Sequence, residues 1–214
     1  MILSTTFPMR SRRSTASRYL QARSSGASRR LRVRSNHAWE LASPSPLHTD
    51  RLGHAIGLSL QGGETLALFG PLGAGKTSLV RGIATGLGAP AAAVSSPTFV
   101  FIHEYRGRLP LAHVDLYRVN STREAESTGL QEYFSGSTVA AIEWADKGLS
   151  ILPQDRLEIL LRHQAVGSRT IRLSATGPTS TALLVEVRRR YARNAKRRVT
   201  TRRSQPKPKR KASS

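Results

Sequence analysis

The fold is decided by the stretch Gly70-Pro71-Leu72-Gly73-Ala74-Gly75-Lys76-Thr77-Ser78, which matches the pattern G-x-x-x-x-G-K-[ST]. The apolar run 65–69 before it predicts a buried strand, and the leucines and isoleucine of 79–87 after it have helical spacing. In the order strand, glycine loop, helix, the backbone N–H groups and the helix N-terminus converge on a bound phosphate. We therefore expect residues 70–78, called the phosphate loop below, to bind the phosphates of a nucleotide.

The polar residues of the phosphate loop have distinct roles in the mechanics of this motif. Lys76 is expected on the β- and γ-phosphates, and the hydroxyl of Thr77 on Mg²⁺. ATP and Mg²⁺ are therefore the expected cofactors. The other expected nucleotide contacts in the loop are Gly70, Leu72, Gly73, Ala74, Gly75 and Ser78.

The charge of the chain lies at its two ends. Formal net charge is +21 over 214 residues. Of the 34 lysines and arginines, nine lie in residues 1–39 and 13 in 188–214, and neither segment contains an acid. The centre, 40–187, holds the other 12 together with all 13 acids and is therefore close to neutral.

We expect three regions: a basic, disordered N-terminal arm over 1–42, an ATPase domain over 43–187 and a basic, disordered C-terminal tail over 188–214. The arm is rich in Arg and Ser and has no apolar signal core, so it does not match a secretory signal. Its composition suits a disordered arm, sequence from an upstream start codon, an organellar transit peptide or a nucleic-acid-binding arm.

Compartment and class follow from what the composition lacks. There is no cysteine, which excludes a disulfide framework and cysteine-based zinc sites. No run approaches the roughly 18 apolar residues of a membrane span. We expect a cytoplasmic protein with no membrane association, or an organellar one if the arm is a transit peptide.

Alternating and continuous apolar runs predict the other elements. A short helix over 52–60 is expected with Thr49 as its N-cap, and a hairpin is expected with strands near 100–105 and 111–119. Ser121 and Glu124 form a capping-box pattern for a helix running to about Phe134, weakened at Gly129. A second hairpin turns around 165–168, and a last helix begins at 179.

Two carboxylates follow apolar strands and could serve a nucleotide site. Asp115 lies in His113-Val114-Asp115-Leu116-Tyr117-Arg118, and Glu143 ends the continuous apolar run 139–142. A carboxylate at a strand end can hold Mg²⁺ or polarise water, although Asp115 could instead cap a turn or pair with Arg118. Trp144 could cover the site or belong to the core.

Four motifs follow one another at short spacings: the phosphate loop, Ser96-Pro97-Thr98-Phe99, the segment 113–118, and Ile142-Glu143-Trp144. Together and in this order they resemble the TsaE (formerly YjeE) family of bacterial ATPases. The resemblance covers about residues 45–187 and neither basic end. One departure is Pro71, where the family usually has Asp.

The resemblance implies roles for individual residues. Thr77 and Glu143 would bind Mg²⁺, and Asp115 would lie at the nucleotide and serve hydrolysis, as a base or as an orienting group. Thr98 would be a switch-type threonine that senses the γ-phosphate. The loop around Gly167 would reach the nucleotide base through backbone groups.

The resemblance also implies a function in tRNA modification. TsaE acts with the transferase TsaD and its dimer mate TsaB to place threonylcarbamoyl on adenosine 37 of tRNAs reading codons that begin with A. We expect slow ATP hydrolysis by the chain alone and stimulation by these partners, because small P-loop proteins need further charge stabilisation. The expected fold is α/β, a mostly parallel P-loop sheet with helices on both faces and antiparallel hairpins.

Two other functions fit parts of the sequence. A P-loop kinase for small molecules would need a lid with clustered arginines, and residues 106–135 offer only scattered ones. A nucleic-acid-binding protein would use the basic ends, which attract phosphate backbones with steep salt dependence. Direct tRNA binding by the ends is therefore expected as an accessory property.

Overall fold

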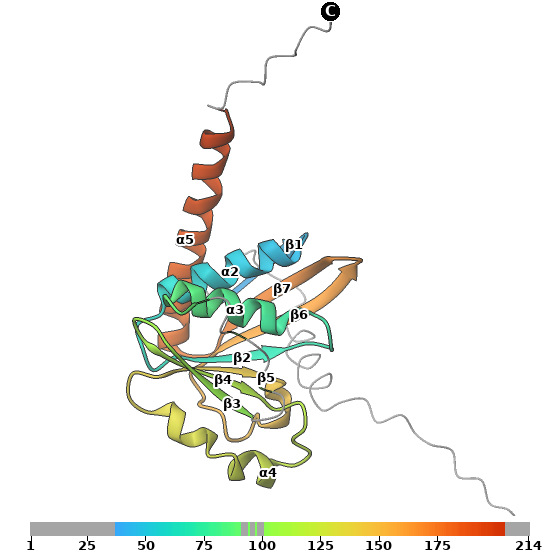
Figure 1. The fold of residues 1–214 in the computed structure, drawn as a ribbon, viewed down its shortest axis with the longest axis vertical. Coiled ribbons are helices and arrows are strands. Elements are labelled where there is room, and N and C mark those ends of the chain that lie inside the picture. Colours follow the sequence, from blue (N-terminus) through green and yellow to red (C-terminus); the bar gives the residue numbers. More distant parts are fainter. Residues whose placement is uncertain (1–36, 91–93, 95–96, 98–100, 204–214) are drawn as a thin grey trace, which may run out of the picture. The chain divides into compact units, whose positions relative to one another are not determined.

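The computed structural model of the protein describes residues 37–90, 94, 97 and 101–203, and side chains as far as 194 (Figure 1). In chain order its elements are β1 (Ala38–Ser43), α2 (Pro46–Ser59), β2 (Thr65–Phe69), α3 (Lys76–Gly86), β3 (Ile102–Arg106), β4 (Pro110–Asp115), α4 (Thr122–Ser127), η2 (Leu130–Phe134), β5 (Val139–Glu143), η3 (Ala145–Lys147), β6 (Leu157–Ala165), β7 (Ser168–Ala175) and α5 (Pro178–Arg203).

Seven strands form one sheet in the order β1-β7-β6-β2-β5-β4-β3. The four central strands β6, β2, β5 and β4 are parallel to one another. The outer pairings, β1 with β7, β7 with β6 and β4 with β3, are antiparallel. The α/β class with a parallel P-loop centre and antiparallel hairpins is thereby confirmed.

Both faces of the central strands are covered, which explains their continuous apolar sequences. Every residue of β2 and of β5 is buried. Leu66 and Leu68 of β2 belong to a core shared with α2, α3 and α5. Outside this core, η2 contacts β5 and η3 contacts β2. The ends of β2 and β5 therefore have little freedom to move, and both lead directly into the predicted site.

Helices α2 and α3 pack backbone to backbone through glycines. A Cβ on Gly53 would lie 2.2 Å from the carbonyl oxygen of Leu79, and one on Gly57 would lie 2.2 Å from that of Ile83. On α3, Gly82 lies opposite Gly53 and Gly86 lies opposite Gly57. A Cβ on either α3 glycine would lie 2.1 or 2.4 Å from a backbone carbonyl oxygen of α2. This contact fixes the height of α3, and hence of the phosphate loop, over the sheet.

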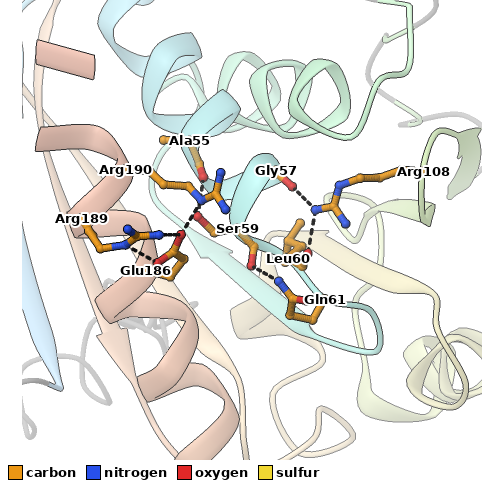
Figure 2. Close-up of polar contacts among 9 residues, drawn as sticks. All are labelled: Ala55, Gly57, Ser59, Leu60, Gln61, Arg108, Glu186, Arg189 and Arg190. Carbon is orange, nitrogen blue, oxygen red and sulfur yellow. Dashed lines mark hydrogen bonds and ion pairs between the residues drawn. The ribbon is translucent and has the colours of Figure 1, made fainter. Parts of the chain in front are cut away.

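The ends of α2 differ from the sequence prediction. Ser45 is the N-cap and Pro46 begins the helix, so the prediction that Thr49 is the cap is wrong. Proline is preorganised for the first turn, which starts the helix before its apolar periodicity begins. At the other end, Arg108 donates to the carbonyl oxygens of Gly57 and Leu60 at 2.8 and 2.6 Å (Figure 2).

The predicted region boundaries also change. Residues 38–42, assigned to the arm, form β1 and pair with β7, while residues 1–36 lie outside the described part. The tail from 188 continues α5 as far as Arg203, because Arg, Lys and Ala favour helix. Trp39 and Tyr191 pack edge to face at 5.6 Å between ring centroids, so the fold includes both.

Ion pairs support α5 where it passes residue 187. Glu186 accepts hydrogen bonds from Arg189 and Arg190 (Figure 2), which lower the pKa of its carboxyl group from 4.5 to about 2. At the start of the helix, the carboxylate of Asp155 accepts from the backbone N–H groups of Thr179 and Ser180. The helix therefore has polar contacts at its beginning and in its middle.

Three other segments follow the sequence prediction with shifts. The 121–134 helix is divided at Gly129, whose φ is +74°, into α4 and the 3₁₀ helix η2. The strand expected over 111–119 ends at Asp115, the last residue of β4. The hairpin of β6 and β7 turns around 165–168, as predicted.

Candidate nucleotide site at the phosphate loop

The phosphate loop joins the buried strand β2 to the start of α3, as predicted. Gly70 has a φ of +140°, and a Cβ there would lie 2.5 Å from the carbonyl oxygen of Leu161. Gly75, with a φ of +99°, is the N-cap of α3, and the first turn of that helix contains no acidic residue. The N–H groups at this end of α3 therefore have no anionic side chain of their own, which is the arrangement that favours a bound anion.

Lys76 is the first residue of α3 and is only 4% exposed. Its Nζ donates to the carbonyl oxygens of Gly70 and Pro71 at 2.8 and 3.1 Å, so the loop curls around the ammonium group. Burial lowers the pKa of Lys76, and the nearby carboxylates of Glu143, Asp115 and Asp146 oppose this shift. The cation is thus held at the loop in a largely dry position, where its charge acts strongly.

Glu143 lies at the carboxyl end of β5 and is joined to the phosphate loop. Its Oε1 accepts a hydrogen bond from Thr77 Oγ1 at 2.8 Å, although the two residues are 66 positions apart in the sequence. Because β5 is parallel to β2, its carboxyl end meets the loop that follows β2. The structure therefore brings together the two residues predicted as metal ligands.

His113 is a site residue that the sequence analysis did not assign. It is fully buried, and its Nε2 lies 2.8 Å from the same Oε1 of Glu143. Its Nδ1 has no hydrogen-bond partner among the described residues. The available signal was its spacing: His113 is two residues before Asp115 in one strand, so both side chains point to the same face.

Asp115 ends β4 beside Glu143, its register partner on β5. Its Oδ1 accepts from the backbone N–H of Tyr117 at 2.9 Å, so it caps the turn after β4. The same carboxylate is near enough to Lys76 to affect the pKa of that side chain. The turn-capping role and a position at the site are therefore compatible.

Trp144 covers Lys76. Its ring centroid lies 3.7 Å from the Lys76 Nζ and 5.0 Å from the ring of Tyr117. Its backbone is left-handed, with a φ of +56°, an unusual conformation for a bulky residue. Immediately after β5, this conformation turns the indole onto the cation, where the attraction between cation and aromatic face operates.

The donor set at the loop suits Mg²⁺. Within the described residues no cluster of three or more His, Cys, Asp or Glu side chains could hold a metal alone. Magnesium commonly takes one or two protein oxygens and completes its shell with phosphates and water. The hydroxyl of Thr77 and the carboxylate of Glu143, 2.8 Å apart at the phosphate loop, fit that pattern.

The remaining predicted residues lie in several places. Gly167, with a φ of +76°, is at the exposed tip of the β6–β7 hairpin, and its carbonyl oxygen accepts from Arg169 at 3.3 Å. Leu72 is 73% exposed on the loop, and its carbonyl oxygen lies 3.4 Å from Nε2 of His163. Thr98 lies outside the described residues, so its switch role stays a prediction. In the described part of the chain, no helix is both long and apolar enough to cross a membrane.

Comparison with known proteins identifies similar chains. Residues 43–171 match the family model described as threonylcarbamoyl adenosine biosynthesis protein TsaE. The chain is 44% identical over 128 residues to a tRNA threonylcarbamoyladenosine biosynthesis protein TsaE of Bacillus subtilis, covering 59% of this chain and 79% of the relative. A Treponema pallidum protein of the same name is 41% identical over 129 residues, with 60% and 95% covered.

A solved structure shows the same fold. The crystal structure of YdiB from Bacillus subtilis superposes with a TM-score of 0.60 and 34% sequence identity, over 71% of this chain and 95% of that one. The family match includes the phosphate loop and the strands that carry Asp115 and Glu143. The likeness to the YdiB structure extends the sequence match to the arrangement of the sheet.

Proposed function

The chain belongs to the TsaE family of tRNA threonylcarbamoyladenosine biosynthesis proteins, and on that premise we propose that it is the Mg²⁺-dependent ATPase subunit of this modification system. Its partners would be the TsaD and TsaB homologues, and its ATP turnover would allow their cycle to repeat. The complex would bind the tRNA, and the basic ends of this chain would also bind it directly.

The observation that carries the proposal is the joining of four groups at one edge of the sheet. Lys76, Thr77, Asp115 and Glu143 come from α3, β4 and β5 and meet at the phosphate loop. The groups are a cation for the phosphates, two oxygen donors for a cation, and a second carboxylate. This combination suits phosphoryl transfer to water, because catalysis of that reaction depends on positioning and charge stabilisation.

Each residue would have a separate task in hydrolysis. The loop N–H groups and Lys76 would bind the β- and γ-phosphates, and Thr77 and Glu143 would hold Mg²⁺. When bound, Mg²⁺ would neutralise charge that develops on the phosphate oxygens. Asp115 would orient or deprotonate the attacking water, and Trp144 would keep bulk water away from Lys76. Thr98 and the backbone near Gly167 would contact the γ-phosphate and the base.

The test is ATP hydrolysis by the purified full chain with Mg²⁺, measured alone and with TsaB and TsaD added. We expect slow turnover alone, stimulation by the partners, and loss of both in Lys76→Ala and Glu143→Ala. Arg81→Ala, an exposed position on α3, is the matched control and should behave as the unchanged chain.

Two results would contradict the proposal. Equal rates with and without TsaB and TsaD would oppose the partner-stimulated function. Turnover that ignores these partners but rises with a small hydroxyl-bearing acceptor would favour the kinase alternative, which family membership does not favour. Retained turnover in Glu143→Ala would remove the metal role from that residue while leaving the phosphate loop in place.

A further inference from the structure

A second buried cation lies behind the phosphate loop. Arg169 of β7 is only 6% exposed. Its Nη1 donates to Thr49 Oγ1 of α2 at 2.8 Å, and its Nη2 donates to the carbonyl oxygen of Gly167 at 3.3 Å. Its Nε is buried and has no hydrogen-bond partner among the described residues. The side chain thus links the hairpin tip with α2, and one of its donors is left unused.

The guanidinium group of Arg169 lies against the first turn of α3. A Cβ placed on Gly75 would be 3.1 Å from Arg169 Nη1 and 3.5 Å from its Cζ. Gly75 is the N-cap of α3, the end of a helix that carries partial positive charge. A full positive charge is therefore buried next to the positive end of a helix, an arrangement that is unfavourable by itself.

Within the described residues, no carboxylate forms an ion pair with this guanidinium group. All 13 acidic residues of the sequence lie in the described part of the chain, and none of them forms an ion pair with Arg169. The other buried arginine, Arg156, pairs with Glu158 at 2.7 Å. Lys76, on the front of the loop, has Glu143 and Asp115 nearby. Arg169 is thus a buried cation that has no ion-pair partner among the described residues.

We propose that Arg169 is a second cation of the nucleotide-phosphate site and that the phosphates of the bound nucleotide are its missing counter-charge. The proposal rests on the proposed function only in taking ATP as the ligand. In this role, Arg169 attracts the phosphates electrostatically from the opposite side of the loop backbone and does not contact them. Its charge and the N-terminus of α3 repel each other in the free protein, and both are attracted to the same anion.

This role predicts opposite effects on stability and on binding. When Arg169→Met removes the charge, Thr49 keeps its hydrogen bond to Ser43 Oγ at 2.8 Å. The Gly167 carbonyl lies at an exposed tip, where water can replace the arginine. The free protein should therefore lose no stability, whereas its affinity for nucleotide phosphates should fall. An arginine with only a structural role would show the reverse, a loss of stability with affinity unchanged.

The experiment compares the affinities of the full chain for ATP, ADP and AMP by calorimetry, beside thermal unfolding without nucleotide. For Arg169→Met we expect about a tenfold to hundredfold loss of ATP affinity, a smaller loss for ADP and the smallest for AMP, following the phosphate charge. The melting temperature should be unchanged or higher. Arg169→Lys keeps the charge and should recover most of the affinity.

Two controls separate this inference from the proposed function. Arg172→Met removes an exposed arginine from the same strand and should leave all three affinities unchanged. Lys76→Ala should lose ATP affinity whatever Arg169 does. If Lys76→Ala binds normally, the nucleotide site itself is misassigned. If only Lys76→Ala loses affinity, the site stands and the inference about Arg169 is overturned.

Three further results would overturn the role proposed for Arg169. An equal loss for ATP, ADP and AMP would mean that Arg169 acts on the base-proximal hairpin and not on phosphate charge. A melting temperature that drops in Arg169→Met, with affinity retained by the folded fraction, would show a structural role. A loss of affinity in Arg169→Lys as large as in Arg169→Met would show that charge is not what matters.

Discussion

At the scale of single residues, the two strand-end carboxylates have different surroundings. Oε1 of Glu143 accepts from Thr77 and lies within hydrogen-bond distance of His113, so this side chain is held from two elements. Asp115 is bound to the turn that follows it through Tyr117. A carboxylate held by the phosphate loop suits a metal ligand, and one at the start of a turn suits contact with water.

Substituting each carboxylate by its amide should separate these roles. Glu143→Gln should abolish the Mg²⁺ dependence of ATP affinity, because an amide is a poorer ligand than a carboxylate for a hard cation. Asp115→Asn should keep that dependence and lower kcat by about a factor of 10² to 10⁴, the usual contribution of a general base. Calorimetry with and without Mg²⁺, beside steady-state hydrolysis, measures both. Loss of Mg²⁺ dependence in Asp115→Asn would reverse the assignment.

The lowered pKa of Lys76 predicts how the free energy of unfolding depends on pH. Burial lowers this pKa below 10.5, the value expected for the unfolded chain. At pH values between the folded-state pKa and 10.5, the folded state therefore binds fewer protons than the unfolded state. In that range the contribution of Lys76 to stability rises with pH. Lys76→Met removes the buried charge, so its advantage over the unchanged chain should be largest at pH 7.5 and shrink toward pH 10. Urea unfolding at several pH values measures this difference.

The exposed Arg81→Met is the control for this experiment, since Arg81 lies on the same helix and its side chain is in solvent. Its stability difference from the unchanged chain should stay constant with pH. A constant difference for Lys76→Met as well would mean that the ammonium group is not desolvated by the loop and by Trp144.

At the scale of elements, the α2–α3 contact supports the phosphate loop from behind. Substitution of a glycine in a helix interior by alanine normally stabilises the protein, by about 0.5–1 kcal/mol. At Gly57 the added methyl group would lie 2.2 Å from the Ile83 carbonyl oxygen, so the helices must separate. Gly57→Ala should therefore destabilise the protein, by about 1–3 kcal/mol as in overpacked cores. Chemical denaturation gives the value.

The control for Gly57→Ala is Arg81→Ala, at an exposed position on the outer side of α3, which should change stability by less than about 0.5 kcal/mol. Because α3 begins at Lys76, a shift of this helix also moves the loop, and ATP affinity of the folded Gly57→Ala protein should fall. A neutral or stabilising Gly57→Ala would mean that the two helices pack less closely than the distances indicate.

The sequence predicted those elements that have strong local signals. The strands 65–69 and 139–143 were predicted with their true ends, because four or five apolar residues stand between clear polar boundaries. The helix cap at Thr49 was wrong because Pro46 starts the helix earlier. Strand β1 was missed because its residues follow a long basic segment, and its partner β7 lies more than 120 positions away.

In the site, too, residues with a local sequence signal were predicted, and residues placed by contacts distant in the sequence were not. Lys76 and Thr77 follow from a motif, and strand ends indicated Asp115 and Glu143. His113 and Arg169 belong to the same region through contacts that need the sheet register, which places β4 beside β5 and β7 behind the loop. The spacing of His113 and Asp115 indicates only that both lie on one face of β4, and Arg169 has no comparable signal. The contacts that place His113 and Arg169 at the site therefore come from the three-dimensional arrangement.

At the scale of the whole molecule, a nearly neutral body carries strongly basic ends. The domain is predicted over 43–187, but the contact between Trp39 and Tyr191 shows that these limits would cut into the fold. A chain of residues 37–191 keeps both aromatic residues and all seven strands. It loses nine arginines from the first segment and ten lysines and arginines from the last, which leaves 15 basic and 13 acidic residues.

Comparison of the full chain with residues 37–191 tests what the basic ends bind. Cations that neutralise phosphates release counterions, so affinity for RNA should fall steeply with salt. If the ends engage six or more phosphates, tRNA affinity of the full chain should drop by about 10³ or more between 50 and 200 mM salt. The 37–191 chain should bind more weakly at 50 mM and with a shallower salt slope, while its melting temperature and ATP affinity stay unchanged. Filter binding over a salt series measures the slope, and equal slopes for the two chains would place any tRNA contact on the folded body.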